Sequence, residues 1–331
     1  MGTMGNRLRD RIEISPHRYA QVAAVALAAL ALIVLTGAAV RLTGSGLGCP
    51  DWPKCYGGTV PPLETHAVIE YGNRLLTGFV GFAVIAASAL AWFRRPFRGH
   101  LAFFGALLPL GVVCQAILGA LVVKHHLAPG LVMGHFILSM LLLDAAFALA
   151  WCARYEPGER RFSSDRLGVW AVRALIPFGQ LTILAGTIAT GSGPHAGAHE
   201  GELVHRFDFE GTGTLEWMVQ RHSTIAAAFG IAAIVVWLLL RRPGGDRRAL
   251  RPLTVVIGLL GLQGAIGGLQ WLLELPSELV WLHVALATVT WLAMLWTVAA
   301  AGRLEPRDAE AHQTDRAEVS GERPAPTLTR I

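Results

Sequence analysis

The chain has 331 residues, of which 53% are hydrophobic and 15% charged, and its formal net charge is +5. Long windows without any charge exclude a water-soluble domain of this size and indicate an integral membrane protein. The positive balance does not indicate a nucleic-acid partner, because the arginines fall in alternate loops, where basic residues orient membrane segments.

Apolar runs long enough to cross a bilayer core of ~30 Å, which takes ~20 helical residues, occur eight times. They lie near residues 20–41, 68–92, 101–123, 131–152, 169–191, 215–240, 252–273 and 279–301. We therefore predict an all-α integral membrane fold, with eight transmembrane helices in two pseudo-twofold-related four-helix bundles. The predicted segments are a cytoplasmic N-terminal segment (1–19), a first bundle (20–152), a cytoplasmic linker (153–168), a second bundle (169–301) and a disordered cytoplasmic tail (302–331).

The second set of four spans repeats the first at a shift of about 148 residues. The run from Gln115 to His135 aligns without a gap with the run from Gln263 to His283, and the Thr-Gly-Ser-Gly sequence at 43–46 recurs at 190–193. Duplicated membrane units are common. Histidines inside the repeated apolar segments, however, indicate a heme pocket.

Twelve histidines are present, and only His135, His222 and His283 fall inside the predicted spans. Each lies within about two turns of the same end of its span, so the three share a shallow depth. A helix–helix hydrogen bond explains a lone intramembrane histidine, whereas three at matched depth favour heme ligation. We expect His222 and His283 to hold one iron from both axial sides, as a low-spin centre suited to electron transfer.

The two halves differ at two polar positions. A shift of 149 places Asn73 opposite His222 and Glu70 opposite Val219. An amide is a poor ligand for heme iron, so His135 is expected to be the one strong axial ligand in the first half. The other face of that iron would then be open or weakly held.

Glu70 permits two interpretations that are compatible with each other. It lies four residues before Arg74, which predicts an i,i+4 salt bridge at the membrane surface. It also shares a helix face with Asn73, three residues on, at the mouth of the predicted pocket. There it would act as a proton acceptor, or as an anion that stabilises a cation developing on the substrate.

Two of the four cysteines share one polar loop, in the sequence Gly-Cys49-Pro-Asp-Trp-Pro-Lys-Cys55. Pro and Trp turn the intervening chain, which favours a disulfide. The alternatives are a free, redox-active pair and a metal site with too few ligands. Cys114 and Cys152 lie in or at the ends of spans and are expected to be packing residues.

Charge sets the predicted orientation. Arginines gather before the first span and after the second, fourth and sixth, so both termini are expected to be cytoplasmic in a multi-pass protein of the cell membrane. The first apolar run is of full length and has no cleavage pattern after it, so we expect a retained first span.

Other polar residues near the same end of the spans have weaker assignments. The turn from Gly191 to Gly197 is either a lid over a pocket or a simple re-entry loop, and Gln115 and Gln263 are expected to make interhelical hydrogen bonds. Candidates for holding heme propionates are Arg41, Arg74, Lys124, His125, His126 and Arg221.

The motifs together resemble one family, the heme A synthases of cytochrome oxidase assembly. The resemblance rests on the stretches from Thr43 to Cys55, Ile69 to Arg74 and Thr190 to Gly197, and on the three intramembrane histidines. It covers roughly residues 20–301. It implies eight helices in two pseudo-symmetric bundles and oxidation of the C8 methyl group of heme O, through hydroxylated intermediates, to the formyl group of heme A.

The resemblance also implies roles for single residues. His222 and His283 would hold a heme b cofactor, and the first half would take heme O, with His135 on its iron and Asn73 and Arg74 as binding residues. Glu70 would be the catalytic acid. The Cys49 and Cys55 pair would form a functional disulfide.

This chain departs from the family pattern in two places. Asn73 stands where the family motif has a second histidine, and the loop between the fifth and sixth spans lacks the second cysteine pair of some members. The resemblance further implies a partnership with the farnesyltransferase that makes heme O. The electron acceptor, the oxygen source and the oligomeric state, including a homo-oligomer, are left open.

Two rival functions remain. A non-catalytic b-type cytochrome that exchanges electrons with quinone would need two similar heme sites, which the asymmetry at Glu70 and Asn73 disfavours. A transporter is disfavoured because the halves run parallel and lack Gly or Pro breaks at the midplane.

Overall fold

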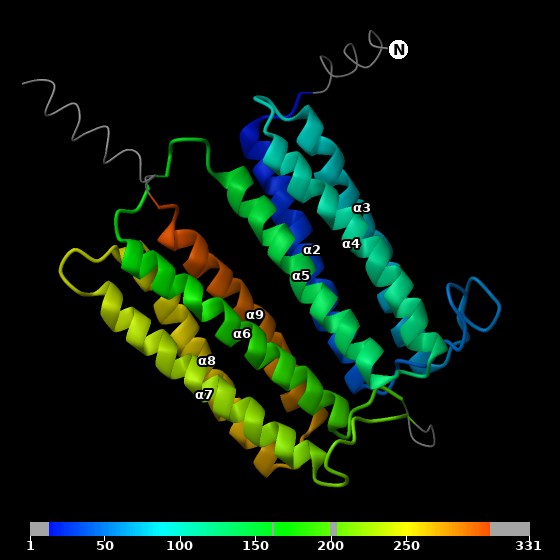
Figure 1. Ribbon diagram of the computed structural model, residues 1–331. Helices are drawn as coiled ribbons and strands as arrows, with labels where there is room; N and C mark the ends of the chain where they lie inside the picture. The colour runs from blue at the N-terminus through cyan, green and yellow to red at the C-terminus, as the bar shows by residue number, and fades with distance from the viewer. Residues whose placement is uncertain (1–12, 161, 199–203, 305–331) are drawn as a thin grey trace, which may run out of the picture.

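The computed structural model describes residues 13–160, 162–198 and 204–304. The predicted disordered tail from residue 305 and most of the predicted N-terminal segment lie outside these residues. Eight long helices form this part of the chain, and each is long and apolar enough to cross a membrane (Figure 1). They are α2 (Pro16–Leu42), α3 (Thr65–Phe93), α4 (Gly99–Lys124), α5 (Pro129–Arg154), α6 (Arg166–Ser192), α7 (Thr214–Leu240), α8 (Leu250–Leu272) and α9 (Ser277–Ala301).

The prediction of an all-α, eight-span membrane protein is therefore confirmed, and no strand occurs in the described ranges. Most helices begin two to four residues before the apolar runs, because local signals set the helix starts. Ser15 caps α2 just before Pro16, and the Asp165 carboxylate accepts the N–H of Gly168 at 2.8 Å to start α6. Long helices satisfy their own backbone groups, as a lipid environment requires.

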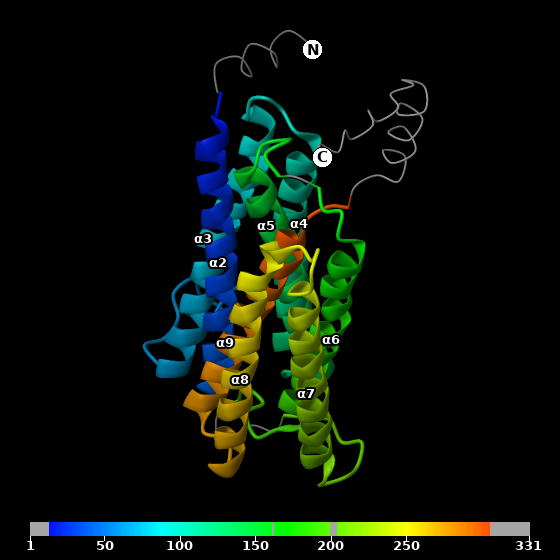
Figure 2. The same cartoon turned by 90° about the vertical axis from the view of Figure 1, so that its left-hand side faces the viewer.

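The helices form two bundles of four. In one, α2 packs on α3, α3 on α4 and α4 on α5, and contact between α2 and α5 closes the ring. In the other, α6 to α9 follow the same order, and α6 meets α9. Figures 1 and 2 show the bundles side by side, with α2 and α5 toward α6 and α9. Both bundles begin at the same end, so the halves run parallel.

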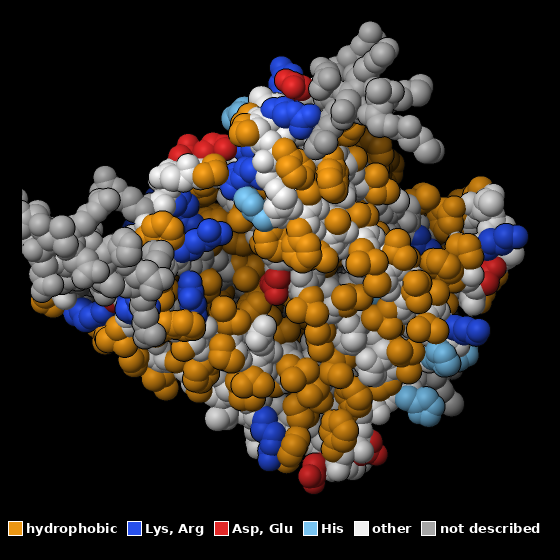
Figure 3. All heavy atoms as spheres, turned by 45° about the horizontal axis from the view of Figure 1, so that its top comes forward, with side chains coloured by type: hydrophobic (Ala, Val, Ile, Leu, Met, Phe, Trp, Pro, Cys, Tyr) orange, Lys and Arg blue, Asp and Glu red, His pale blue; other side chains and the backbone are white. Residues whose placement is uncertain are grey.

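The two ends of the protein differ in chemistry. We call the end with the loop from Cys49 to Cys55 the disulfide end, and the opposite end the arginine-rich end. Lys and Arg side chains gather at the arginine-rich end, above the mostly hydrophobic flanks of the helices (Figure 3). Its ion pairs include fully buried Arg94 with Glu156, and Arg242 with Asp165. Although burial opposes it, hydrogen bonds from main-chain N–H groups lower the pKa of Asp165.

Candidate functional site

The three intramembrane histidines lie at similar depth near the disulfide end. His135 and His283 are each six residues from the first residue of α5 and α9, and His222 is eight residues into α7. At ~1.5 Å per residue, these positions lie about 9–12 Å from the helix starts. The structure therefore places the three predicted ligands in one layer.

In the second bundle, His222 and His283 face each other. Their ring centroids are 6.1 Å apart. Two metal–imidazole bonds of about 2.0 Å, plus the distance from each ligating nitrogen to its ring centre, give a separation on the order of 6 Å. Two imidazoles suit a heme iron, because the porphyrin supplies the other four nitrogens. A bare metal ion is a poorer fit, since no cluster of three His, Cys, Asp or Glu ligands occurs among the described residues.

Neighbouring groups orient this imidazole pair. Nδ1 of His222 lies 3.0 Å from the main-chain oxygen of Thr182 on α6, and this contact directs Nε2 away from the helix backbone. With its carboxamide turned to satisfy its neighbours, Gln263 on α8 donates to Nδ1 of His283 at 2.9 Å. The Thr182 contact matches the pattern of ligating histidines, whose second ring nitrogen commonly donates to a carbonyl oxygen. The Thr182 contact is made by the main chain, so no side-chain pattern in the sequence indicated it.

The first bundle presents one histidine and several unsatisfied atoms. Nδ1 of His135 and Oδ1 of Asn73 are both buried without a hydrogen-bond partner among the described residues. Buried polar atoms without a hydrogen-bond partner are rare in protein interiors, so these two atoms fit a pocket that binds a polar group. Gln115 donates to the main-chain oxygen of His135 at 3.0 Å, which confirms it as an interhelical contact.

Glycines beside the rings reflect the same asymmetry. A Cβ at Gly186 on α6 would lie 3.0 Å from Cε1 of His222, so this position must stay small. At the shift of 147 residues that relates 43–46 to 190–193, the corresponding residue in the first half is Ala39. The second half thus has a glycine against the His222 ring where the first half has an alanine.

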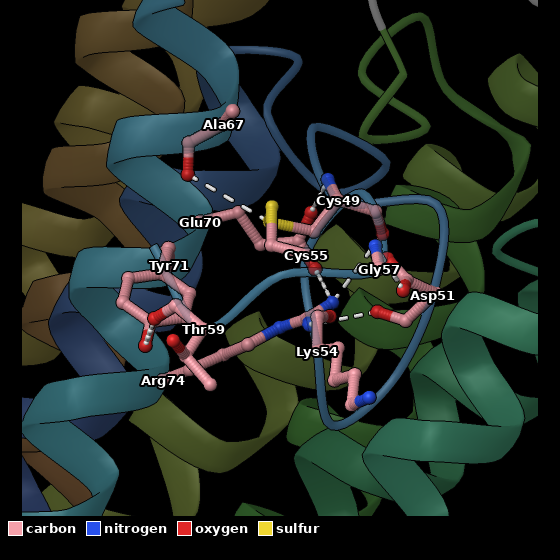
Figure 4. The surroundings of a disulfide bond; sticks show 10 residues. All are labelled: Cys49, Asp51, Lys54, Cys55, Gly57, Thr59, Ala67, Glu70, Tyr71 and Arg74. Carbon is pink, nitrogen blue, oxygen red and sulfur yellow. Dashed lines mark hydrogen bonds and ion pairs between the residues drawn. A yellow bond between two sulfur atoms is a disulfide. The ribbon is translucent and has the colours of Figure 1, made fainter. Parts of the chain in front are cut away.

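Glu70 is 6% exposed and both of its oxygens are engaged (Figure 4). Oε2 accepts the main-chain N–H of Cys49 at 2.7 Å, and Oε1 pairs with the Arg74 guanidinium at 2.5 Å. The predicted i,i+4 salt bridge is therefore confirmed. The carboxylate lies against the disulfide loop, a contact that sequence spacing did not indicate.

The disulfide between Cys49 and Cys55 is present, so this prediction is also confirmed. Both cysteines are fully buried, and Arg74 fixes the loop between them by donating to the main-chain oxygens of Asp51 and Lys54 at 2.9 Å. Cys114 and Cys152 are free; Cys152 is half-buried, whereas Cys114 is exposed on α4, so the prediction of a packing role is wrong for Cys114. Arg74 thus links the Glu70 carboxylate to the backbone of the disulfide loop, and its guanidinium is already engaged by both.

The other polar candidates have specific partners. Arg41 reaches from α2 to the main-chain oxygen of Thr190 on α6 at 2.8 Å. Arg221 lies over the Trp217 ring, 3.3 Å from its centroid. Among the described residues, no hydrogen bond joins either guanidinium to a candidate iron-ligating histidine. Their role toward propionates therefore stays a prediction, as it does for Lys124, His125 and His126.

The Gly-rich turn lines a pocket at the disulfide end of the second bundle. Ser192, Gly193 and Pro194 border a cavity of about 730 Å³, together with Arg206 and Trp271. His195 contacts the main-chain oxygen of Leu275 at 2.7 Å, which ties the turn to the loop before α9. The turn thus borders an open pocket, and its role as a lid stays a prediction. Arg206 was not singled out from the sequence, because only the fold brings its loop here.

Comparison with known proteins decides the family. The family of cytochrome oxidase assembly proteins, COX15-CtaA, matches residues 20–68 and 63–199, which together are more than half of the chain. The chain belongs to this family. The matched residues contain His135, Asn73, Glu70 and the disulfide, while His222 and His283 lie beyond them.

Curated relatives agree. A heme A synthase of Lysinibacillus sphaericus (strain C3-41) is 28% identical over 50% of this chain and 56% of the relative. A heme A synthase of Bacillus pumilus (strain SAFR-032) is 34% identical over 36% of this chain and 39% of the relative. A protoheme IX farnesyltransferase of Thermus thermophilus is 28% identical over 82% of this chain and 46% of that protein. The chain matches about half, or less, of the length of these relatives.

Proposed function

We propose that this protein is a heme A synthase, an oxidoreductase that converts the C8 methyl group of heme O to the formyl group of heme A through hydroxylated intermediates. The observation that carries this proposal is the asymmetry of the two histidine sites in a member of the cytochrome oxidase assembly family. One site has paired imidazoles with bonded Nδ1 atoms. The other has a single histidine and open polar atoms.

The second bundle is the relay site in this proposal. His222 and His283 would hold a heme b cofactor between them, and that heme would supply one-electron storage and transfer. The contribution of the protein is to fix both rings: the Thr182 oxygen orients His222, and Gln263 orients His283. With His222 and His283 both holding the group, this site would be closed to substrate.

The first bundle is the reaction site. His135 would bind the iron of heme O, and the Asn73 side chain, with its free Oδ1, would contact the substrate on the opposite face. Glu70 has donors on both oxygens, so it fits a fixed anion that stabilises positive charge on the substrate better than a mobile proton carrier. Arg74 keeps that carboxylate in place.

Location and partners follow from charge and from the relatives. We propose that the arginine-rich end is cytoplasmic and that the protein spans the cell membrane, with heme O arriving from its lipid phase. A segment similar to 82% of this chain is part of a Thermus thermophilus protein named protoheme IX farnesyltransferase. This supports a functional partnership with the enzyme that makes heme O.

Extraction and separation of the hemes from purified protein tests the proposal. A heme A synthase is expected to yield heme b together with heme O, a hydroxylated intermediate or heme A. Heme b alone would contradict the proposal and favour the b-type cytochrome. The absence of any heme would contradict both and favour a transporter.

A further inference from the structure

One acidic residue in the middle of a span belongs to neither histidine site. Asp144 lies on α5, ten residues before Arg154, or ~15 Å along the helix from its arginine-rich end. Its Oδ1 accepts a hydrogen bond from Nε1 of Trp291 on α9, at 2.6 Å. Ionisable residues at this depth are costly, and they mark function where they occur.

The contact joins the two bundles. Two other hydrogen bonds between their spans, from Trp281 to Leu35 and from Arg41 to Thr190, end on main-chain oxygens. Within the described ranges, Asp144 and Trp291 make the only hydrogen bond between side chains that links the spans of one bundle to those of the other. The identity of both side chains therefore matters at this point of the interface.

The same two helices carry the candidate iron ligands. Asp144 follows His135 by nine residues, or two and a half turns, so the two lie on opposite faces of α5. One face serves the first bundle, and the other meets the second. Trp291 follows His283 on α9 by eight residues, about 12 Å along the axis. A rigid helix thus connects each partner of the hydrogen bond to a histidine.

The repeat does not explain this pair. At the shift of 148 residues, Asp144 corresponds to Leu292, and Trp291 corresponds to Leu143. The indole of Trp291 is 4% exposed and packs closely against α6, where a Cβ at Gly179 would lie 2.9 Å from its ring. The contact was therefore added to the duplicated scaffold at the interface between the bundles.

We propose that Asp144 is a positioning residue that holds α5 against α9 and so fixes the reaction site relative to the relay site. The proposal rests on the proposed function. Loss of the contact lets the bundles shift, and a misplacement of about 1 Å can lower a reaction rate by as much as ~100-fold.

Three variants test it. Asp144→Asn keeps a carbonyl oxygen for the indole, Asp144→Leu removes the acceptor, and Trp291→Phe removes the donor. Thr288→Val is the matched control on α9, because the Thr288 hydroxyl bonds only within its own helix, to the main-chain oxygen of Val284.

The first readout is the distance between the bundles. Spin labels on cysteines placed at exposed Leu121 and Leu272, with Cys114 and Cys152 changed to Ser, report the distance between α4 and α8 by pulsed EPR. The second readout is the rate of heme A formation by the full chain. The absorbance of the heme held by His222 and His283 shows whether the relay site is intact.

Asp144→Leu and Trp291→Phe are expected to broaden the distance distribution and to slow heme A formation by on the order of tenfold or more, with the relay absorbance retained. Asp144→Asn and Thr288→Val should behave like the wild type. An unchanged distribution in both disrupting variants would overturn the proposal, as would equal loss in Asp144→Asn and Asp144→Leu. If distances respond as expected but even the wild type makes no heme A, only the proposed function fails.

Discussion

The two bundles have the same arrangement of helices, but only the second has a pair of facing histidines. In the second, two imidazoles face each other at 6.1 Å and Nδ1 of each ring has a contact. In the first, Nδ1 of His135 and Oδ1 of Asn73 have no hydrogen-bond partner among the described residues. In the proposed function, the difference between Asn73 and His222 separates a closed site, suited to storing electrons, from an open site that can admit substrate.

The disulfide ends of the bundles differ in the same sense. The first bundle has a buried carboxylate that bonds to the backbone of a disulfide-closed loop, whereas Val219 of the second bundle has no such capacity. The buried carboxylate and the disulfide therefore both lie on the half with the single histidine. This supports a division of labour between chemistry in one half and relay in the other.

Removing either relay histidine should have the largest effect. His222→Ala or His283→Ala is expected to abolish the low-spin heme signal, because one axial ligand no longer holds the iron from both sides. Absorbance and EPR spectra of the purified protein measure this. His195→Ala, which changes a loop residue outside the spans, is the control. A low-spin signal that persists in both variants would show that the halves are assigned the wrong way round.

Glu70→Ala should leave the relay spectrum unchanged and reduce heme A formation by on the order of 100-fold, because a charge aimed at the reacting group is lost. Product analysis by chromatography measures this. Arg74→Gln is the matched variant, since it breaks the same ion pair but retains the Glu70 carboxylate and its bond from the Cys49 main-chain N–H. Equal losses in both would assign Glu70 to loop structure alone, and full activity in Glu70→Ala would exclude it from the reaction.

Asn73→His should make the halves more alike. Asn73 corresponds to His222 at the shift of 149 residues, so with an imidazole at residue 73 heme in the first bundle is expected to gain a second axial ligand and a second low-spin signal. Heme A formation should change less than in Glu70→Ala. The double variant with His135→Ala should lose that new signal. If Asn73→His shows no new signal, residue 73 does not face the iron.

Replacing either of the repeat-related glutamines should have the smallest effect on stability and spectrum. Gln115→Leu and Gln263→Leu each remove an interhelical hydrogen bond, which is worth about 0.6 kcal/mol in a membrane interior. Both should lower the thermal midpoint slightly, and only Gln263→Leu should alter the relay spectrum, because only Gln263 contacts Nδ1 of its histidine. A spectral change in Gln115→Leu alone would contradict this assignment.

The sequence by itself determined the eight spans, the parallel repeat, the shared depth of the histidines and the pair of Glu70 with Arg74. These features depend on local hydrophobicity and on helical spacing, which are readable along the chain. The disulfide was also favoured, because its cysteines share one short loop.

Only the tertiary structure decided which groups meet across helices. The approach of His222 to His283, the bond from the Cys49 backbone to Glu70, and the link between Asp144 and Trp291 all join distant segments. Each depends on how neighbouring helices rotate and cross, which packing sets and composition does not. Asp144 was visible in the sequence as an acid inside a span, but its partner, 147 residues away, was not.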